Sequence, residues 1–464
     1  MRALLLSALP LLAAPALAAD AIDPVALEAA IDKGLTYLKS LQQPDGSFQL
    51  PKNDDSLETN FVQGYCALAA LTMLKCGVPP DDPAIERAFQ HIYSLPLRKT
   101  YEVSLVILAI EARFQPPAEL LEEKKEHGYT TVVRSLFQKR ARKVDQQKLQ
   151  ECVDWLVGHQ APQPIGAAWR YPQGEINQDN SCTQYAVLAL KSARRLGANV
   201  PIGVFEKVAD FFVSQQDATG PEVEWFPVPA ADGLIGEMLT LEQRRKREEK
   251  ERKEEEKRAG KEATRERAKN PGGEVTIERR RMNARGWGYL PRPAPEGPPP
   301  ESRTGPVPQR TVSEQISTGS MTCSGIAALC IAKSELENHP ASWRPREQAV
   351  EQAIRDGCAF LANWWNPKAN FSSDPKKTVG WQYYYFYSVE RAGVLAGTYK
   401  WGTHDWWDET AAYLLGAQQP EGSWPDTKGL SKLSPTCFAL LFLTRATVPL
   451  VPLPPKRIKT GVPR

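Results

Sequence analysis

A short phrase near the start of the chain returns near its end and constrains the fold more than any other feature. Residues 41–50 read LQQPDGSFQL, and residues 417–426 read AQQPEGSWPD. In both copies proline stops the preceding helix, glycine permits a positive φ, and the aromatic residue can pack back between units. The phrase therefore predicts a turn that follows the first helix of a repeated unit.

Two kinds of helical segment alternate around these turns. The first kind has an apolar stripe at helical spacing and a charged opposite face, which predicts an outer helix. Outer helices are expected to begin near Val25, Pro83, Gln147, Pro201, Arg346 and Trp407. The second kind is apolar on most sides, as in GYCALAAL at 64 and TQYAVLAL at 183, and predicts a buried inner helix. About six such pairs must pack side by side to share one core, and closure would make the first and last units neighbours.

The N-terminal residues predict export. One arginine is followed by an apolar run that ends in Ala-Leu-Ala, and the run is shorter than the roughly 20 residues of a membrane span. We expect a signal peptide over residues 1–19, a periplasmic or extracellular location, and no transmembrane span. The eight cysteines stand mostly in apolar helical segments, so we expect buried thiols, with one or two disulfides left open.

Two segments interrupt the repeats. Residues 242–269 are dense in both charge signs and nearly free of apolar side chains, so they predict a solvated helix or disorder, with docking to a partner as the alternative. A proline-rich linker follows over 291–308, and a shorter basic insertion covers roughly 116–144. The expected organisation is a repeat body over 20–240 and 311–447, an insertion with linker over 241–310, and a basic tail over 448–464. The net charge of +3, from 58 basic and 55 acidic side chains, gives no indication of a nucleic-acid partner.

The phrases QPDGSF and QPEGSW, together with inner helices that open on threonine such as NSCTQYAVLALKSA, resemble the prenyltransferase and squalene-cyclase repeat. Members of that family fold as an α/α toroid around a central cavity. The resemblance covers residues 25–447 apart from the insertions, and it implies an all-α toroid of about six helix pairs. Because one such fold hosts several chemistries, the family's motifs have to be compared residue by residue.

Neither chemistry that the resemblance implies has its complete motif. Terpene cyclases of the family carry Asp-x-Asp-Asp, whereas here Asp179 stands beside Asn180. Protonating an alkene needs a carboxylic acid activated by its neighbours, which a single Asp lacks. Protein prenyltransferases hold zinc with an Asp, a Cys and a His, but the surroundings of Asp179, Cys182, Cys323 and His404 do not match that pattern. We therefore expect no metal and no cofactor.

A group of aromatic side chains keeps sugar chemistry open as an alternative. Some polysaccharide lyases use an α/α toroid with a Tyr, a His and an Arg or Asn in the groove. Aromatic rings stack on sugars, and a Tyr or His can abstract a proton. The candidate cavity residues are Asp179, Asn180, Trp381, Tyr383, Tyr384, Tyr385, Tyr387, His404 and Asp405. The favoured hypothesis is a toroid that binds an apolar, glycan or protein ligand in its cavity, with no catalytic set identified; a lyase is the alternative.

Overall fold

The computed structural model describes residues 22–50, 61–124, 127–161, 168–171, 179–232, 281–290, 316–377, 379–425 and 431–450. Within these ranges the chain is mostly α-helical, with two short antiparallel strand pairs, which confirms the all-α class. The expected signal peptide, the charged segment 242–269, the linker 291–308 and the tail beyond 450 lie outside the described residues.

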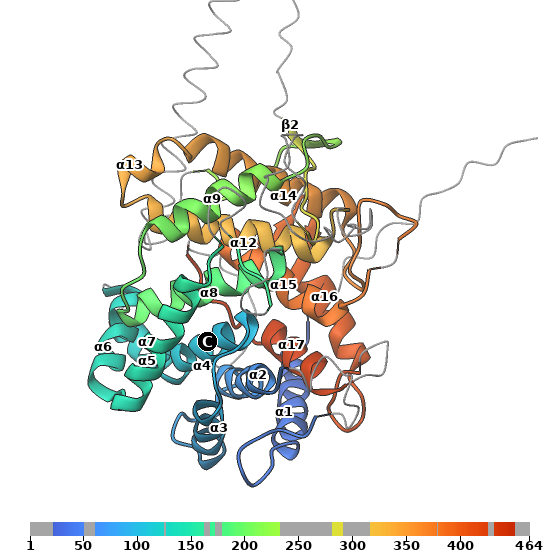
Figure 1. Ribbon diagram of the computed structural model, residues 1–464. Helices are drawn as coiled ribbons and strands as arrows, with labels where there is room; N and C mark the ends of the chain where they lie inside the picture. Colours follow the sequence, from blue (N-terminus) through green and yellow to red (C-terminus); the bar gives the residue numbers. More distant parts are fainter. Residues whose placement is uncertain are drawn as a thin grey trace, which may run out of the picture.

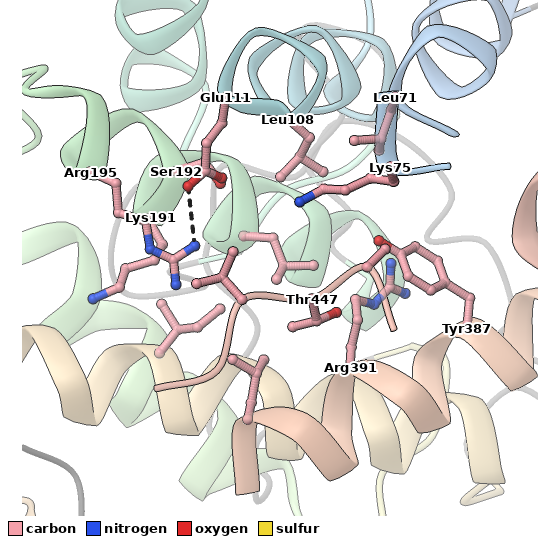
Figure 2. A pocket seen from close by; sticks show the side chains of 15 residues that line it. Leu71, Lys75, Leu108, Glu111, Lys191, Ser192, Arg195, Tyr387, Arg391 and Thr447 are labelled. Carbon is pink, nitrogen blue, oxygen red and sulfur yellow. Dashed lines mark hydrogen bonds and ion pairs between the residues drawn. The ribbon is translucent and has the colours of Figure 1, made fainter. Parts of the chain in front are cut away.

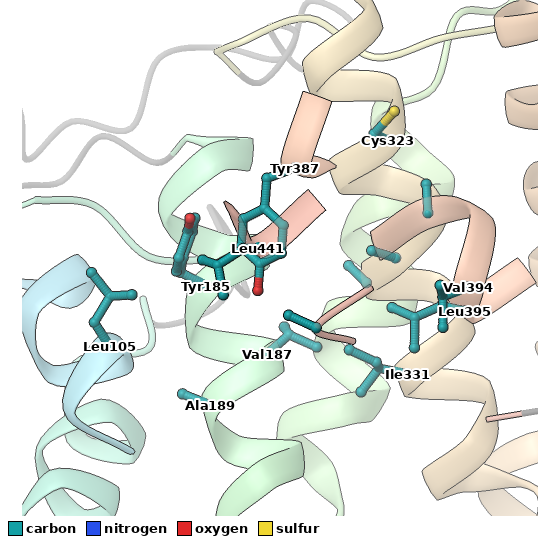
Figure 3. Packing of buried hydrophobic residues seen from close by; sticks show 14 of the residues in the cluster. Leu105, Tyr185, Val187, Ala189, Cys323, Ile331, Tyr387, Val394, Leu395 and Leu441 are labelled. Carbon is teal, nitrogen blue, oxygen red and sulfur yellow. The ribbon is translucent and has the colours of Figure 1, made fainter. Parts of the chain in front are cut away.

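Six helices with nearly all of their residues buried form the centre of the molecule, and they are called the inner helices below. They are α2 (Val62–Lys75), α4 (Thr100–Arg113), α8 (Asn180–Leu196), α12 (Gly319–Leu336), α15 (Gln382–Ala396) and α17 (Leu433–Leu443). Each contacts the next in this order, and α17 contacts α2, so the series of contacts closes on itself (Figure 1). Their buried side chains belong to one hydrophobic core (Figure 3).

Six amphipathic helices, called the outer helices, cover this centre. They are α1 (Pro24–Ser40), α3 (Pro83–Ser94), α7 (Lys143–Gly158), α9 (Gly203–Gln215), α14 (Glu347–Trp364) and α16 (Trp406–Ala417). Helix α3 shows the pattern: it buries Ile85, Ala88, Phe89 and Ile92, which lie on one face at helical spacing. Each outer helix contacts at least one inner helix, as the two kinds of sequence predict.

Glutamines at the ends of four outer helices connect them to other outer helices. Each donates from Nε2 to a main-chain carbonyl of the outer helix that follows, and the last returns to the first. The bonds run from Gln42 to Ala84 (2.8 Å), Gln160 to Val204 (3.2 Å), Gln216 to Ala353 (2.9 Å) and Gln418 to Ala30 (2.8 Å). The two copies of the opening phrase therefore do more than stop their helices: their first glutamines link units.

Buried tryptophans fix the turns after three outer helices. Each indole N–H donates to a carbonyl of the outer helix before it, and each backbone N–H donates to a threonine hydroxyl of the inner helix after it. The sets are Trp169 with Leu156 and Thr183, Trp287 with Phe212 and Thr322, and Trp424 with Leu414 and Thr436. The repeated aromatic and threonine of the sequence are thus partners in one hydrogen-bonded turn.

Glycine is required where these turns approach a neighbouring helix. Gly46 and Gly422 have φ of 86° and 101°, and a Cβ added to them would lie 2.1 Å from the Arg87 carbonyl oxygen and 2.3 Å from that of Lys33. A side chain at either position would have to displace backbone in addition to adopting an unfavourable φ.

The remaining elements are short or lie in insertions. They are α5 (Ala118–Glu123), α6 (Gly128–Arg140), α13 (Pro340–Trp343), β1 (Glu222–Glu224), β2 (Arg281–Asn283), β3 (Lys400–Trp401) and β4 (His404–Asp405). Strand β1 pairs with β2, and β3 pairs with β4, both antiparallel. Helix α6, in the shorter basic insertion, contacts α8 and buries Val132, Val133 and Phe137.

Residues 281–290 depart from the expected organisation, which assigned 241–310 to an insertion and linker. Met282, Ala284 and Trp287 are buried, and the Trp287 indole lies between α9 and α14, so this segment belongs to the repeat body. The physical reason is the turn described above, because RGWGYL supplies the aromatic residue that its unit needs. The charge-dense residues before it and the proline-rich residues after it obscured that signal.

All eight cysteines are free thiols, and all but Cys76 are buried. Burial raises the pKa of the Cys66 thiol to about 11, so this side chain is a neutral apolar group at physiological pH. The expectation of buried thiols is confirmed, and the open possibility of disulfides is not realised. None of the helices in the described ranges is both long and apolar enough to cross a membrane.

Candidate functional site

A cavity of about 670 Å³ lies where the inner helices begin, and it is called the central cavity below. Nine aromatic side chains line it: Phe61, Tyr65, Tyr101, Tyr171, Tyr185, Tyr289, Trp381, Tyr384 and Phe438. The polar lining side chains are Ser181, Thr318, Ser320, Asn370, Ser372, Lys377 and Ser434. Among the described residues that line the cavity there is no Asp, Glu, His or Cys.

The helix starts explain how these side chains meet. Side chains four residues apart lie on one helix face, so a pair in the first turns of each inner helix can point to the same side. Such pairs are Phe61 and Tyr65, Tyr101 and Leu105, Ser181 and Tyr185, and Ser434 and Phe438. None of these pairs was predicted to line a cavity. Their repeated four-residue spacing at the starts of inner helices could have indicated it.

Three hydroxyl groups form a connected group at the wall of the cavity, called the hydroxyl cluster below. The Ser181 hydroxyl lies between the phenol oxygens of Tyr101 and Tyr384, and its distance to the Tyr384 oxygen is 2.6 Å. Tyr384 also donates to Gln184 Oε1 at 3.2 Å. Burial raises the pKa of the Tyr384 phenol to about 12, so the cluster is neutral and rich in O–H donors.

A buried guanidinium lies behind this wall. The carbon at the centre of the Arg391 guanidinium lies 4.2 Å from the ring centroid of Tyr387, 4.8 Å from that of Tyr185 and 5.9 Å from that of Tyr384. Arg391 Nη2 donates to Gln184 Oε1 at 3.2 Å, which is the same oxygen that accepts from Tyr384. The cation is therefore one hydrogen-bonded residue away from the cavity wall.

Trp381 lies at the edge of the central cavity in an unusual conformation. It is 57% exposed, and its φ of 64° places a bulky residue in the left-handed region at the start of α15. Asn370 donates to the Gly380 carbonyl and to the Ser320 hydroxyl, both at 3.0 Å, and so holds the loop before Trp381 against α12. A strained, exposed aromatic residue beside a cavity is typical of a site that contacts a ligand.

Of the nine predicted site residues, Trp381 and Tyr384 line the central cavity. The other three tyrosines of the run do not. Tyr383 is buried with its ring edge against Phe386, Tyr385 donates to the Asn366 carbonyl at 3.0 Å, and Tyr387 lies beneath Arg391. Because successive helical residues point in directions about 100° apart, one member of the run reaches the cavity while its neighbours face other helices.

Asp179 and Asn180 have structural partners next to the cavity, and neither is a lining residue. Asp179 Oδ1 accepts from the Cys182 N–H at 2.6 Å, which caps α8, and burial raises the pKa of this carboxyl to about 6. Asn180 Nδ2 donates to the Gly288 carbonyl at 2.7 Å. Asn180, whose backbone N–H also donates to the Tyr289 carbonyl, therefore attaches the segment carrying Tyr289 to the start of α8.

His404 and Asp405 were expected near the same mouth, and this expectation is wrong. They form strand β4, away from the residues that line the cavity. His404 Nδ1 lies 3.5 Å from Glu409 Oε1, and Asp405 Oδ1 accepts from the Asp408 N–H at 3.0 Å to cap α16. They stand close to the tyrosine run in sequence, but the tyrosines lie at the start of α15 and the strand pair follows its end, so the length of the helix separates them.

A second pocket, of about 40 Å³, lies at the opposite ends of the inner helices (Figure 2). Its lining includes the charged side chains of Lys75, Glu111, Lys191, Arg195 and Arg391. Basic side chains near helix C-termini stabilise the negative end of the helix dipole, and the Arg195–Glu111 contact of 3.3 Å neutralises part of the charge. In the part of the chain that the structure describes, no group of three or more Cys, His, Asp or Glu side chains is arranged to hold a metal ion.

The fold and the cavity define a mostly helical protein with an internal, aromatic-lined chamber at the starts of its central helices. In comparisons with known proteins, no protein-family model and no curated sequence matches this chain. The central cavity is therefore the feature of this structure that bears on its function.

Proposed function

We propose that this protein is an exported α/α toroid of six helix pairs that binds an apolar, ring-stacking or chain-like ligand in its central cavity. The observation that carries the proposal is the cavity itself, about 670 Å³ in volume with nine aromatic side chains in its wall. Ligand sites of proteins occupy about 300 to 1,000 Å³ and are mostly apolar with a few polar groups. The lining has this composition.

The toroid is supported by contacts between the first and last units. Helix α17 contacts both α1 and α2, and the Gln418 side chain donates to the Ala30 carbonyl of α1. These contacts join residues nearly the whole described chain apart, as a closed arrangement of pairs requires. They also agree with the resemblance to the prenyltransferase and squalene-cyclase repeat.

The lining favours binding over the chemistries considered for such a fold. Alkene protonation requires an acid at the cavity, and the lyase alternative requires a base such as histidine beside the tyrosine. Asp179 caps α8 outside the lining, and His404 faces Glu409. We therefore propose a binding protein, and we make no second proposal of lyase, cyclase or prenyltransferase activity.

The test uses a neutral apolar fluorophore, N-phenyl-1-naphthylamine, whose emission rises in an apolar site. Wild-type protein should bind it saturably. Leu68→Trp and Leu105→Trp, which enlarge two side chains of the lining, should each weaken binding at least about tenfold by filling the cavity. Val25→Trp, at a residue that is 73% exposed on α1, is the control and should bind as wild type does.

Near-ultraviolet circular dichroism establishes that each variant is folded. Saturable binding that is equal in wild type, Leu68→Trp and Leu105→Trp would show that the fluorophore binds elsewhere and would contradict the proposal. Absence of saturable binding by folded wild-type protein would contradict it as well.

A further inference from the structure

A buried guanidinium, Arg391, lies behind the wall of the central cavity against three aromatic rings. Arg391 is 1% exposed, and among the described residues its hydrogen bonds go to two neutral oxygens, Gln184 Oε1 and Ser388 Oγ. Its Nε and Nη1 atoms are buried and have no hydrogen-bond partner in the described part of the chain. A buried cation without a paired anion is costly, so its surroundings favour a negative charge nearby.

The adjacent carboxylate supplies part of that charge, but its hydrogen bonds go to another segment. Glu390 accepts from the Thr447 N–H at 3.1 Å and from the Thr447 hydroxyl at 2.6 Å, so its carboxyl group is bonded to the C-terminal segment. Burial also raises the pKa of Glu390 to about 7, which leaves it partly neutral at physiological pH. Figure 2 shows Thr447 and Arg391 at the small pocket. Because Arg391 also shares the Gln184 oxygen with Tyr384, its guanidinium lies between the small pocket and the wall of the central cavity.

The central cavity has a positive electrostatic environment from two further sources. All six inner helices begin beside it, so the positive ends of their dipoles converge there, and the Asp179 carboxylate offsets the one on α8. Apart from the phenols, the only ionisable side chain among the described lining residues is that of Lys377, at the edge of the cavity. A cation in the cavity would be repelled, and the faces of Tyr185 and Tyr384 are already in contact with Arg391.

We propose that the central cavity binds an apolar carboxylic acid, with its carboxylate at the hydroxyl cluster of Tyr101, Ser181 and Tyr384 and its hydrocarbon body against the aromatic rings. This inference rests on the proposed binding function and names the ligand class. The three hydroxyls rotate to donate to the carboxylate, and Tyr384 exchanges its bond to Gln184 Oε1 for this one. Charge-assisted hydrogen bonds of this kind are about twice as strong as neutral ones. Arg391 offsets the ligand's charge from behind the Tyr384 ring and keeps its own bond to Gln184 Oε1.

Three probes with the same twelve-carbon chain and different head groups test the charge. Dodecanoate is anionic, dodecanol is neutral and dodecyltrimethylammonium is cationic; each is titrated calorimetrically into the full chain at pH 8 and below its micelle concentration. We expect dodecanoate to bind at least about tenfold more tightly than dodecanol, and the ammonium to bind most weakly.

Two matched tyrosine substitutions on α15 locate the head group. Tyr384→Phe removes one hydroxyl of the cluster and should reduce the preference for dodecanoate over dodecanol to within about threefold, with dodecanol affinity unchanged. Tyr387→Phe removes a phenol that also lies against Arg391 but does not line the cavity, and it should keep the wild-type preference. A Ser181→Ala variant repeats the test on α8.

The outcomes separate the two proposals. Equal affinity for the three probes, tightest binding of the ammonium, or an unchanged preference in folded Tyr384→Phe and Ser181→Ala would overturn the carboxylate site and leave the apolar cavity standing. Failure of wild-type protein to bind any of the three probes and the neutral fluorophore would overturn both.

Discussion

Replacing Trp424 by alanine tests how the last unit joins the first. The Trp424 side chain is fully buried, its indole N–H donates to the Leu414 carbonyl at 2.8 Å, and its ring lies against α1. A Cβ added to Gly34 of α1 would lie 2.9 Å from that ring, which shows how closely the two units approach. The substitution therefore empties space at the junction between the two ends of the described repeat series.

The expected loss of stability follows from burial. Removing a buried Phe or Trp costs about 3 to 5 kcal/mol, and the unpaired Leu414 carbonyl adds roughly 1 kcal/mol. We expect a decrease of about 4 kcal/mol in the free energy of unfolding. Trp381→Ala is the matched control, because Trp381 is 57% exposed, and its loss should be below about 1 kcal/mol.

Urea unfolding followed by far-ultraviolet circular dichroism measures both variants against wild type. The midpoint should fall clearly for Trp424→Ala and only slightly for Trp381→Ala, with the dependence on urea unchanged. Equal midpoints for the two variants would refute the reasoning, because Trp424 would then contribute no more than an exposed side chain.

Three further predictions concern the closure, the buried acid and the charged insertion. Gln418→Ala should lower the unfolding free energy by about 1 kcal/mol in the same urea assay, because it removes the side-chain hydrogen bonds to the Ala30 carbonyl of the first unit and to the Gly422 carbonyl. Gln419→Ala, whose side chain bonds locally to Ala417, should change it by less than about 0.5 kcal/mol. Burial raises the pKa of Glu390 from 4.5 to about 7, so between these pH values the folded state keeps a proton that the unfolded state loses. The unfolding free energy should therefore fall by about 3 kcal/mol as the pH rises through this window, and Glu390→Gln should remove this decrease, as measured by melting temperatures from pH 4.5 to 8. Deleting residues 242–269 should leave the melting temperature within about 2 °C of wild type, because that sequence offers almost no apolar area to bury; a decrease of many degrees would contradict this.

The helix pairs were predictable because their causes are local. Apolar side chains at positions 85, 88, 89 and 92 define a one-sided helix before any tertiary contact is known, and the apolar surroundings of Cys66 indicate burial on all sides. The turn after α16 was equally predictable, because the conformational preferences of its proline and glycine and the packing of its tryptophan are local properties. The sequence therefore predicted the alternation of outer and inner helices and the burial of Trp424.

The composition of the cavity was not predictable in the same way. A run of tyrosines on one helix attracted attention, yet Tyr65, Tyr101 and Tyr185 stand singly on three other helices and meet only after these helices pack. Their pattern is visible between repeats, at equivalent positions in different units, and not within any one segment. The burial of Arg391 could not be predicted either, because the rings that surround its guanidinium come from both α8 and α15.

The opposite ends of the inner helices differ in chemistry, and this difference explains why one end holds the candidate site. At the helix C-termini, Lys75, Lys191 and Arg195 offset the negative dipole ends, and Thr447 covers Glu390, which leaves a pocket of only about 40 Å³. At the helix N-termini the lining is aromatic and hydroxylic, and the described lining contains no acidic side chain; Asp179, which caps α8, lies outside it. The first end is filled by the protein's own charged side chains, whereas the second has space, hydroxyl donors and converging helix N-termini, which are the properties that an apolar carboxylate requires.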